Sequence, residues 1–177
     1  MAGPRWLMPF MGAAILLTLV VSLVDCALDT QEPVRLLNAA GAVLMLTGAV
    51  LRSWAIKTLG RYFLDEVTIL PDQPLVTCGP FAYLRHPSEL GTMCLVLGSA
   101  MVLGSLTGAV LFVVLIVPCV LWRTRLEDVV LAHHFPVEFA AYCRQVHAFR
   151  PVMRATFSQP LAILGPKNAG CPGAECH

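Results

Sequence analysis

The chain has 177 residues, the size of one domain, and 57% of them are hydrophobic whereas only 13% are charged. Its mean hydropathy of +0.73 lies far above that of soluble globular proteins and indicates an integral membrane protein. A formal net charge of +1, without a basic stripe in the sequence, argues against nucleic acid as a partner. The seven cysteines are odd in number and form no CxxC pair, so they predict neither a disulfide framework nor a zinc site.

Four apolar runs have the length, or nearly the length, needed to cross a hydrocarbon core of about 30 Å. They cover residues 7–24, 36–52, 89–103 and 106–122. The first could instead be a signal peptide, but its length and the lack of a small-x-small cleavage site before Asp25 favour a membrane helix. Gly41 and Gly48 lie two helical turns apart on one face of the second run, where small residues let membrane helices approach closely.

The connections between these runs differ in length and polarity. Only Gly104 and Ser105 separate the last two runs, which predicts a tight helical hairpin, and Pro118 is expected to bend its second helix. Residues 58–88 are mixed in polarity and rich in turn residues. We therefore expect a loop that lies against the membrane surface, with a short strand-like piece at residues 67–70.

Basic residues gather at one end of the predicted bundle. If four helices cross in sequence, this end carries Arg5, Arg52, Lys57, Arg61, Arg85, Arg123 and Arg125. The opposite end carries the acidic segment 25–35 and the Gly-Ser turn. By the positive-inside rule, both termini are expected on the cytoplasmic side or its equivalent.

After the last apolar run, the sequence RTRLEDVVLAHHFPVEFAAYCRQVHAFRP keeps apolar residues at helical spacing. Pro136 can open a new helix at its first turn. The apolar face of this segment predicts an amphipathic region folded back on the membrane or on the loop. His133 and His134 point about 100° apart on a helix and have no evident third ligand, so we expect no metal site.

These features predict an all-α integral membrane protein with four or five transmembrane helices, a cytoplasmic-side loop and C-terminal amphipathic helices. Residues 1–154 are expected to form a single domain. Residues 155–177 are rich in Pro, Gly and Ala and are expected to form a poorly ordered tail, and the pattern gives no role to Cys171 and Cys176 in this tail.

Two clusters of charged residues lie at the cytoplasmic end of the predicted bundle. The first cluster belongs to the stretch LVTCGPFAYLRHPSELG and consists of Arg85, His86 and Glu89; the second is Arg123, Arg125, Glu127 and Asp128. Arg85 could be a simple interfacial anchor, and Arg123 with Glu127 a surface ion pair. However, charges at the mouth of a bilayer are costly unless they are paired or used. Two clusters on one face favour a pocket for a charged or zwitterionic ligand.

Several signatures of soluble enzymes do not occur in the sequence. There is no GxGxxG after a strand, no GxxxxGK[ST] and no GxSxG. Any cofactor is therefore expected to bind through a membrane-type architecture.

The stretch LVTCGPFAYLRHPSELG, followed about 30 residues later by RTRLEDVVLAHHFPVEFAAYCRQV, resembles the isoprenylcysteine carboxyl methyltransferase family and the related phospholipid methyltransferases. The resemblance covers about residues 50–151, including Leu59-Gly60-Arg61 upstream. This chain departs from the family pattern at Glu89 (usually an aromatic residue), Asp128 (Glu), Pro136 (Gly) and Phe139 (Tyr). Glu89 matters most, because it alters the wall of the expected cofactor site.

The resemblance implies a membrane-bound enzyme that binds S-adenosylmethionine through this loop and the C-terminal helix. The implied cofactor-binding residues are Leu75, Val76, Phe81, Tyr83, Arg85, His86, Pro87, Ser88, Glu89 and Glu127. The implied catalytic residues are Arg123, which would meet the acceptor carboxylate, and Glu127, which would hold the amino group of the cofactor. The implied partner is a lipid or lipidated acceptor, with the carboxylate of a prenylated cysteine first and phospholipid amines or small thiols as alternatives.

Two interpretations from other classes stay open. Membrane reductases of the steroid-reductase type carry an RHP-like motif and use a nicotinamide cofactor, although they usually have more spans than this chain. A membrane scaffold could also keep the fold without the activity. Binding of S-adenosylmethionine or of NADPH would separate the three interpretations.

Overall fold

The structure is a computed structural model that describes residues 6–28, 35–63 and 73–149. Within these ranges all regular secondary structure is helical, as the sequence predicts. The helices are α1 (Leu7–Leu28), α2 (Arg35–Leu59), α3 (Pro87–Val102), α4 (Leu106–Leu111), α5 (Val117–His134) and α6 (Pro136–Gln145), with 3-10 turns at Gly60–Tyr62 and Gly79–Ala82 and a π-helical turn at Phe112–Ile116. The expected strand-like piece at 67–70 and the tail at 155–177 lie outside the described residues.

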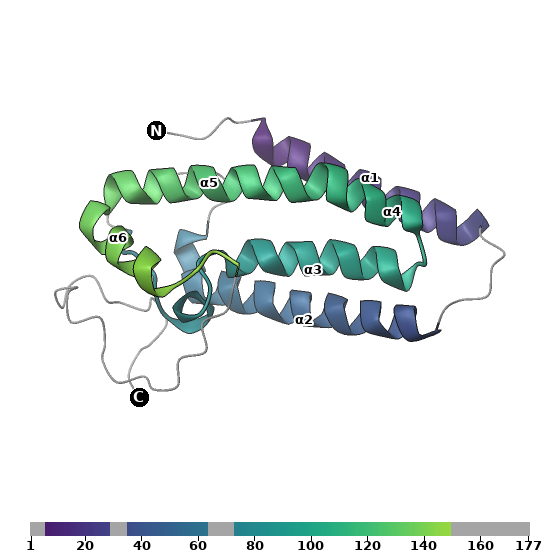
Figure 1. Cartoon of the computed structure of the whole chain (residues 1–177), viewed down its shortest axis with the longest axis horizontal. Coiled ribbons are helices and arrows are strands. Elements are labelled where there is room, and N and C mark those ends of the chain that lie inside the picture. Colours follow the sequence, from purple (N-terminus) through teal and green to yellow (C-terminus); the bar gives the residue numbers. More distant parts are fainter. Residues whose placement is uncertain (1–5, 29–34, 64–72, 150–177) are drawn as a thin grey trace.

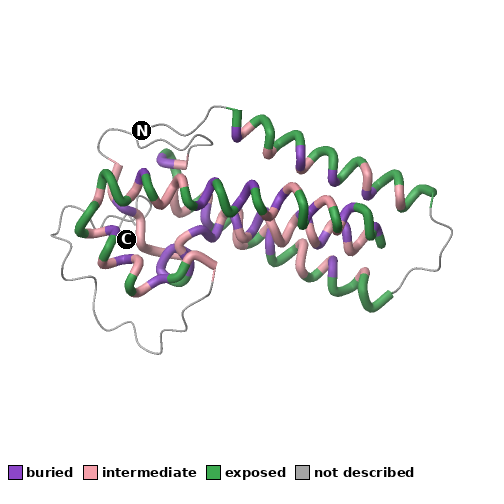
Figure 2. Tube along the Cα trace, turned by 45° about the horizontal axis from the view of Figure 1, so that its top comes forward, coloured by how far each residue is buried: buried purple, intermediate pink, exposed green. Residues whose placement is uncertain are grey.

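Three of the described helical segments are long and apolar enough to cross a membrane: Leu7–Leu28, Arg35–Tyr62 and Leu106–His134. The last segment joins α4, the π-helical turn and α5, so the helix continues well past residue 122. The fourth predicted run is the shorter apolar helix α3, which has 16 residues. Large apolar side chains on the outer faces of α1 and α2 are exposed, for example Leu23 and Leu36, as Figure 2 shows for the two helices as a whole. The chain is a multi-pass integral membrane protein.

The helices α1, α2, α3 and the α4–α5 segment run along one another, and α6 lies at one end of this bundle (Figure 1). Helices α2 and α3 pack closely against each other through glycines. A Cβ atom on Gly48 would lie 2.7 Å from the Gly91 carbonyl oxygen, and one on Gly98 would lie 2.6 Å from the Met45 nitrogen. A Cβ atom on Gly41 would lie 2.9 Å from the Gly98 carbonyl oxygen. The predicted role of Gly41 and Gly48 in close helix packing is confirmed.

The predicted hairpin between residues 103 and 106 is also confirmed. Gly104 adopts a positive φ of 68°, a conformation that favours glycine, and the Ser105 side chain accepts a hydrogen bond from the Gly108 amide at the start of α4. The Ser105 hydroxyl donates to the Asp25 carboxylate of α1 at 2.6 Å. Pro118 stands in the first turn of α5, immediately after the π-helical turn, where the regular hydrogen-bond ladder is already interrupted.

The C-terminal helix α6 folds back on the loop that precedes α3. Pro136 opens α6, as the sequence predicts, and Phe139 and Tyr142 pack with Leu75 and Val146 in a small buried cluster. The Arg85 amide then donates to the His147 carbonyl oxygen at 3.1 Å, so the segment after α6 runs along the loop. These contacts hold the two charged segments of the chain in one place.

One prediction about the cysteines was wrong. Cys78 takes part in a disulfide, although the odd number of cysteines and the lack of a CxxC pair predicted no disulfide framework. The other described cysteines, Cys26, Cys94, Cys119 and Cys143, are free.

Candidate functional site

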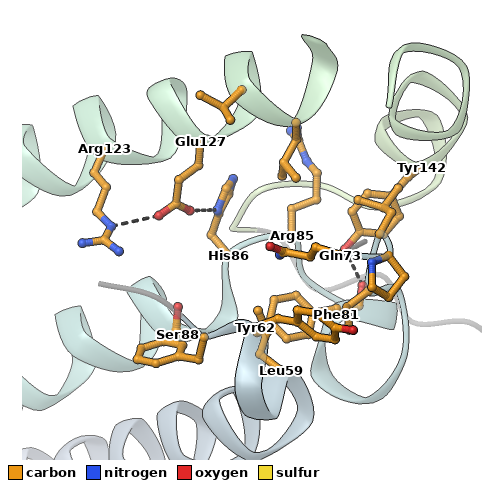
Figure 3. A pocket seen from close by; sticks show the side chains of 16 residues that line it. Leu59, Tyr62, Gln73, Phe81, Arg85, His86, Ser88, Arg123, Glu127 and Tyr142 are labelled. Carbon is orange, nitrogen blue, oxygen red and sulfur yellow. Dashed lines mark hydrogen bonds and ion pairs between the residues drawn. The ribbon is translucent and has the colours of Figure 1, made fainter. Parts of the chain in front are cut away.

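A cavity of about 140 Å³ opens at the end of the bundle where α2, the loop, α5 and α6 meet. Its lining combines charged and apolar side chains from segments far apart in the sequence (Figure 3). The lining residues are Leu59, Tyr62, Phe63, Gln73, Pro74, Leu75, Val76, Phe81, Arg85, His86, Ser88, Arg123, Glu127, Val130, Leu131 and Tyr142.

The loop reaches this position through its turn residues. Gly79 has a positive φ of 59° and Pro80 follows it at the start of a 3-10 turn, which makes the chain reverse over the end of α2. A Cβ on Gly79 would lie 2.9 Å from the Thr58 hydroxyl, so a larger residue would also collide with α2. Pro87 then starts α3, and His86 is the residue immediately before the helix.

Charged side chains from the loop and from α5 form a continuous chain of contacts beside the cavity. The Arg123 Nε donates to Glu127 Oε1 at 2.9 Å, and Glu127 Oε2 lies 3.2 Å from His86 Nδ1 (Figure 3). His86 Nε2 lies 2.9 Å from Asp128 Oδ1, and the other oxygen of Asp128 accepts from Arg85 at 2.9 Å. Arg85 and His86 of the loop are thus bound to neighbouring carboxylates of one helix.

His86 is held in its charged form by this arrangement. Both ring nitrogens face carboxylates, so both donate only when the ring is an imidazolium. Burial alone lowers the pKa of His86, but the hydrogen bonds and negative charges of Asp128 and Glu127 raise this pKa to about 9. Near neutral pH the cavity therefore has a buried cation next to two anions.

Arg123 is a second deeply buried cation of the site. Its side chain is only 6% exposed and pairs with Glu89 of α3, whose side chain is 4% exposed, at 3.1 Å. Its Nη1 also contacts the sulfur of Met8 in α1. Arg123 therefore joins three helices at the edge of the cavity.

The opposite wall of the cavity is apolar and is fixed by Tyr142 of α6. The Tyr142 hydroxyl donates to the Phe81 carbonyl oxygen at 2.6 Å, and burial raises the pKa of this hydroxyl above its usual value. Phe81 and Tyr62 bring aromatic rings to the cavity from the loop and from the turn after α2. The site thus has a charged side and an aromatic side.

Most of the residues assigned from the sequence line this cavity: Leu75, Val76, Phe81, Arg85, His86, Ser88, Arg123 and Glu127. The other three do not line it. Tyr83 is 40% exposed, Pro87 is buried at the start of α3, and Glu89 contacts Arg123 outside the cavity lining.

Several lining residues were not predicted from the sequence. Val130 and Leu131 follow Glu127 by three and four residues on one helix, so their helical spacing could have indicated them. Tyr62 and Tyr142 carry no local signal, because only the packing of α2 and α6 against the loop brings them to the cavity. Asp128 was placed in the second charged cluster, but its bridge between Arg85 and His86 was not foreseen. Among the described residues, no group of three or more His, Cys, Asp or Glu side chains could hold a metal ion.

Several known proteins resemble this chain in sequence or in fold. The model of the isoprenylcysteine carboxyl methyltransferase (ICMT) family matches residues 41–133. Protein-S-isoprenylcysteine O-methyltransferase A of Arabidopsis thaliana is 30% identical over 108 residues, which are 60% of this chain and 55% of the plant protein. The Schizosaccharomyces pombe protein-S-isoprenylcysteine O-methyltransferase is 28% identical over 162 residues, 80% of this chain and 69% of the yeast protein.

A solved structure shares the fold. The eukaryotic intramembrane Ras methyltransferase ICMT superposes with a TM-score of 0.65 at 23% identity, covering 79% of this chain and 51% of that protein. The chain thus spans only a little more than half the length of the Arabidopsis relative and about half of the solved chain. Because the family model covers more than half of the sequence, including both charged segments, the chain belongs to the isoprenylcysteine carboxyl methyltransferase family.

Proposed function

We propose that this protein transfers a methyl group from S-adenosylmethionine to a membrane-associated acceptor, with the carboxylate of a prenylated cysteine as the first candidate. The observation that carries the proposal is the row of contacts Arg123–Glu127–His86 along the cavity. It joins the two segments that resemble the methyltransferase family, and it ends at a buried arginine at the junction with α1 and α3.

The residues present fit the cofactor. S-adenosylmethionine has an amino group and a carboxylate at one end and an adenine ring at the other. Glu127 is an acceptor for the amino group. Arg85 and His86 are cations for the carboxylate, and the Arg85 Nε is buried without a hydrogen-bond partner. Phe81 and Tyr62 offer aromatic faces for the adenine.

When bound, the sulfonium of the cofactor supplies the methyl group that is transferred. The protein's own part is to position the two reactants, because a carboxylate nucleophile requires in-line approach and no proton transfer. Arg123 has the shape to hold a carboxylate through two hydrogen bonds. Glu127 and Glu89 pair with the Arg123 guanidinium and balance its positive charge inside the protein.

The acceptor is proposed to enter from the bilayer at the junction of α1 and α5. The rings of Trp6 and Trp122 meet there in an edge-to-face pair, 5.3 Å between centroids, and both side chains are about half exposed. Exposed tryptophans of this kind are typical of the membrane–water interface. Met8, two residues after Trp6, already contacts Arg123. We further propose that this end of the bundle, with its basic residues, faces the cytoplasm and that both termini are on the cytoplasmic side. We also propose that α3 is a fourth transmembrane span.

The test is transfer of a labelled methyl group from S-adenosylmethionine to a panel of prenylcysteine, phospholipid and thiol acceptors by the purified protein in lipid. We expect transfer to the prenylcysteine. Transfer only to an amine or a thiol would keep the reaction class and replace the acceptor. Binding of NADPH instead of S-adenosylmethionine would favour a reductase, and binding of neither would favour an inactive scaffold.

A further inference from the structure

Glu89 is a carboxylate buried in an unusual position. It lies in the first turn of α3, its side chain is 4% exposed, and its Oε2 has no hydrogen-bond partner. Its other oxygen, Oε1, lies 3.1 Å from Arg123 Nε. A buried carboxylate with one unsatisfied oxygen is costly, so Glu89 is not explained by fold stability alone.

The donors of Arg123 show how loosely Glu89 is held. The Nε carries one hydrogen, and this hydrogen is donated to Glu127 at 2.9 Å. Glu127 is held in turn by His86 through its other oxygen. Glu89 therefore remains near Arg123 mainly by charge, and it is the less firmly bound of the two carboxylates.

The other cations around Glu89 have partners of their own. Besides Arg123, the cations that act on Glu89 are Arg52 and His86. The Arg52 Nη1 donates to the Thr92 hydroxyl at 2.6 Å, and His86 faces Glu127 and Asp128. The charge of Glu89 is therefore directed mainly at Arg123.

We propose that Glu89 is a specificity-determining residue that competes with the carboxylate of the acceptor for Arg123. An acceptor carboxylate that approaches Arg123 meets a guanidinium already paired with two carboxyl groups, Glu127 and the buried Glu89. The site therefore discriminates little between a carboxylate and a neutral group of the same shape. The inference rests on the proposed function, because it assigns Arg123 to the acceptor.

The experiment compares two ligands that differ only in charge: an N-acetylated S-prenylcysteine and its carboxamide. Their dissociation constants are measured on the full chain in lipid, with and without S-adenosylhomocysteine, and kcat and KM are measured for the acid. The parent is expected to bind the carboxamide at least as tightly as the acid. In Glu89→Gln the acid should bind about tenfold more tightly, the size of one charge-assisted hydrogen bond, while the carboxamide is unaffected.

Two further variants complete the design. Glu89→Asp keeps the charge and is expected to keep the parent's ratio of acid to carboxamide affinity. Glu138→Gln removes a carboxylate of α6 that does not line the cavity and is expected to change neither ligand's affinity. The gain in Glu89→Gln should appear in KM far more than in kcat, because Glu89 acts on binding through Arg123.

Three results would overturn the role of Glu89: a parent that binds the acid at least tenfold more tightly than the carboxamide, a Glu89→Gln variant that binds the acid no better, or one that gains equally for both ligands. The first result is measured on the parent alone and does not depend on a variant that folds. A failure of the proposed function looks different, since the parent would then neither bind S-adenosylmethionine nor transfer its methyl group.

Discussion

The α2–α3 seam and the charged cluster at the cavity are stabilised by opposite means. The seam contains glycines at which an added Cβ would come within 3 Å of the facing backbone, as at Gly48 and Gly98. The charged cluster instead keeps long side chains, such as Arg123 and His86, buried against carboxylates. The seam therefore depends on shape and the cluster on charge. A steric change should disrupt the first, and a change of protonation or charge the second.

The largest effect is expected from Gly98→Leu in the seam. A side chain there would collide with the backbone of α2 at Met45, and overpacking of this kind costs roughly 1–3 kcal/mol or more. We expect a strong loss of thermal stability in detergent. Gly12→Leu is the matched control, because a Cβ on Gly12 of α1 meets nothing within 4 Å. Equal stability of the two variants would contradict the close packing of the seam.

The next effect concerns the pH dependence of stability. The pKa of His86 is raised to about 9 in the fold from 6.5 in the unfolded chain. Its stabilising contribution is therefore complete below pH 6.5 and is lost as the pH rises through about 9. At about 1.4 kcal/mol for each unit of pKa, the loss amounts to about 3 kcal/mol at most.

This dependence is measured by unfolding the protein without cofactor at a series of pH values. His86→Gln is the control, because this variant keeps every other group that titrates between pH 6.5 and 9. We expect the fall in stability between pH 6.5 and 9 to be much shallower in the variant. An identical slope in both proteins would mean that His86 is not the buried cation of the cluster.

The smallest effect on stability is expected from Arg123→Lys, which keeps the charge but loses the planar guanidinium. We expect a tenfold or greater fall in kcat with the prenylcysteine acceptor, because lysine cannot hold a carboxylate through two parallel hydrogen bonds. Affinity for S-adenosylmethionine should change little by comparison. Unchanged turnover would remove the assigned role of Arg123.

The seam and the charged cluster also differ in how well the sequence predicts them. The helices, the Gly104–Ser105 hairpin and the glycine face of α2 follow from local patterns of apolar and small residues, and the structure confirms them. The loop and α5 were likewise expected to meet at one end, because their charges flank the same side. The spacing of small and apolar residues along the chain is therefore nearly sufficient to predict the seam.

The partners within the cluster could not be predicted in this way. The bridge of Asp128 between Arg85 and His86 and the ion pair of Glu89 with Arg123 depend on how α5 is rotated against α3. The contact of Tyr142 with Phe81 depends on the return of α6 over the loop. The disulfide of Cys78 was also not predicted, because the odd number of cysteines and the lack of a CxxC pair gave no sign of it.

The most direct test of the account is the affinity of the purified protein for S-adenosylmethionine in the parent, Glu127→Ala, His86→Ala and Glu138→Ala proteins. We expect Glu127→Ala and His86→Ala each to weaken binding by about a hundredfold, the loss of one or two charge-assisted hydrogen bonds, in proteins that remain folded and inserted. Glu138→Ala should bind like the parent. If Glu127→Ala and His86→Ala both bind S-adenosylmethionine as tightly as the parent, the cavity between the loop and α5 is not the cofactor site.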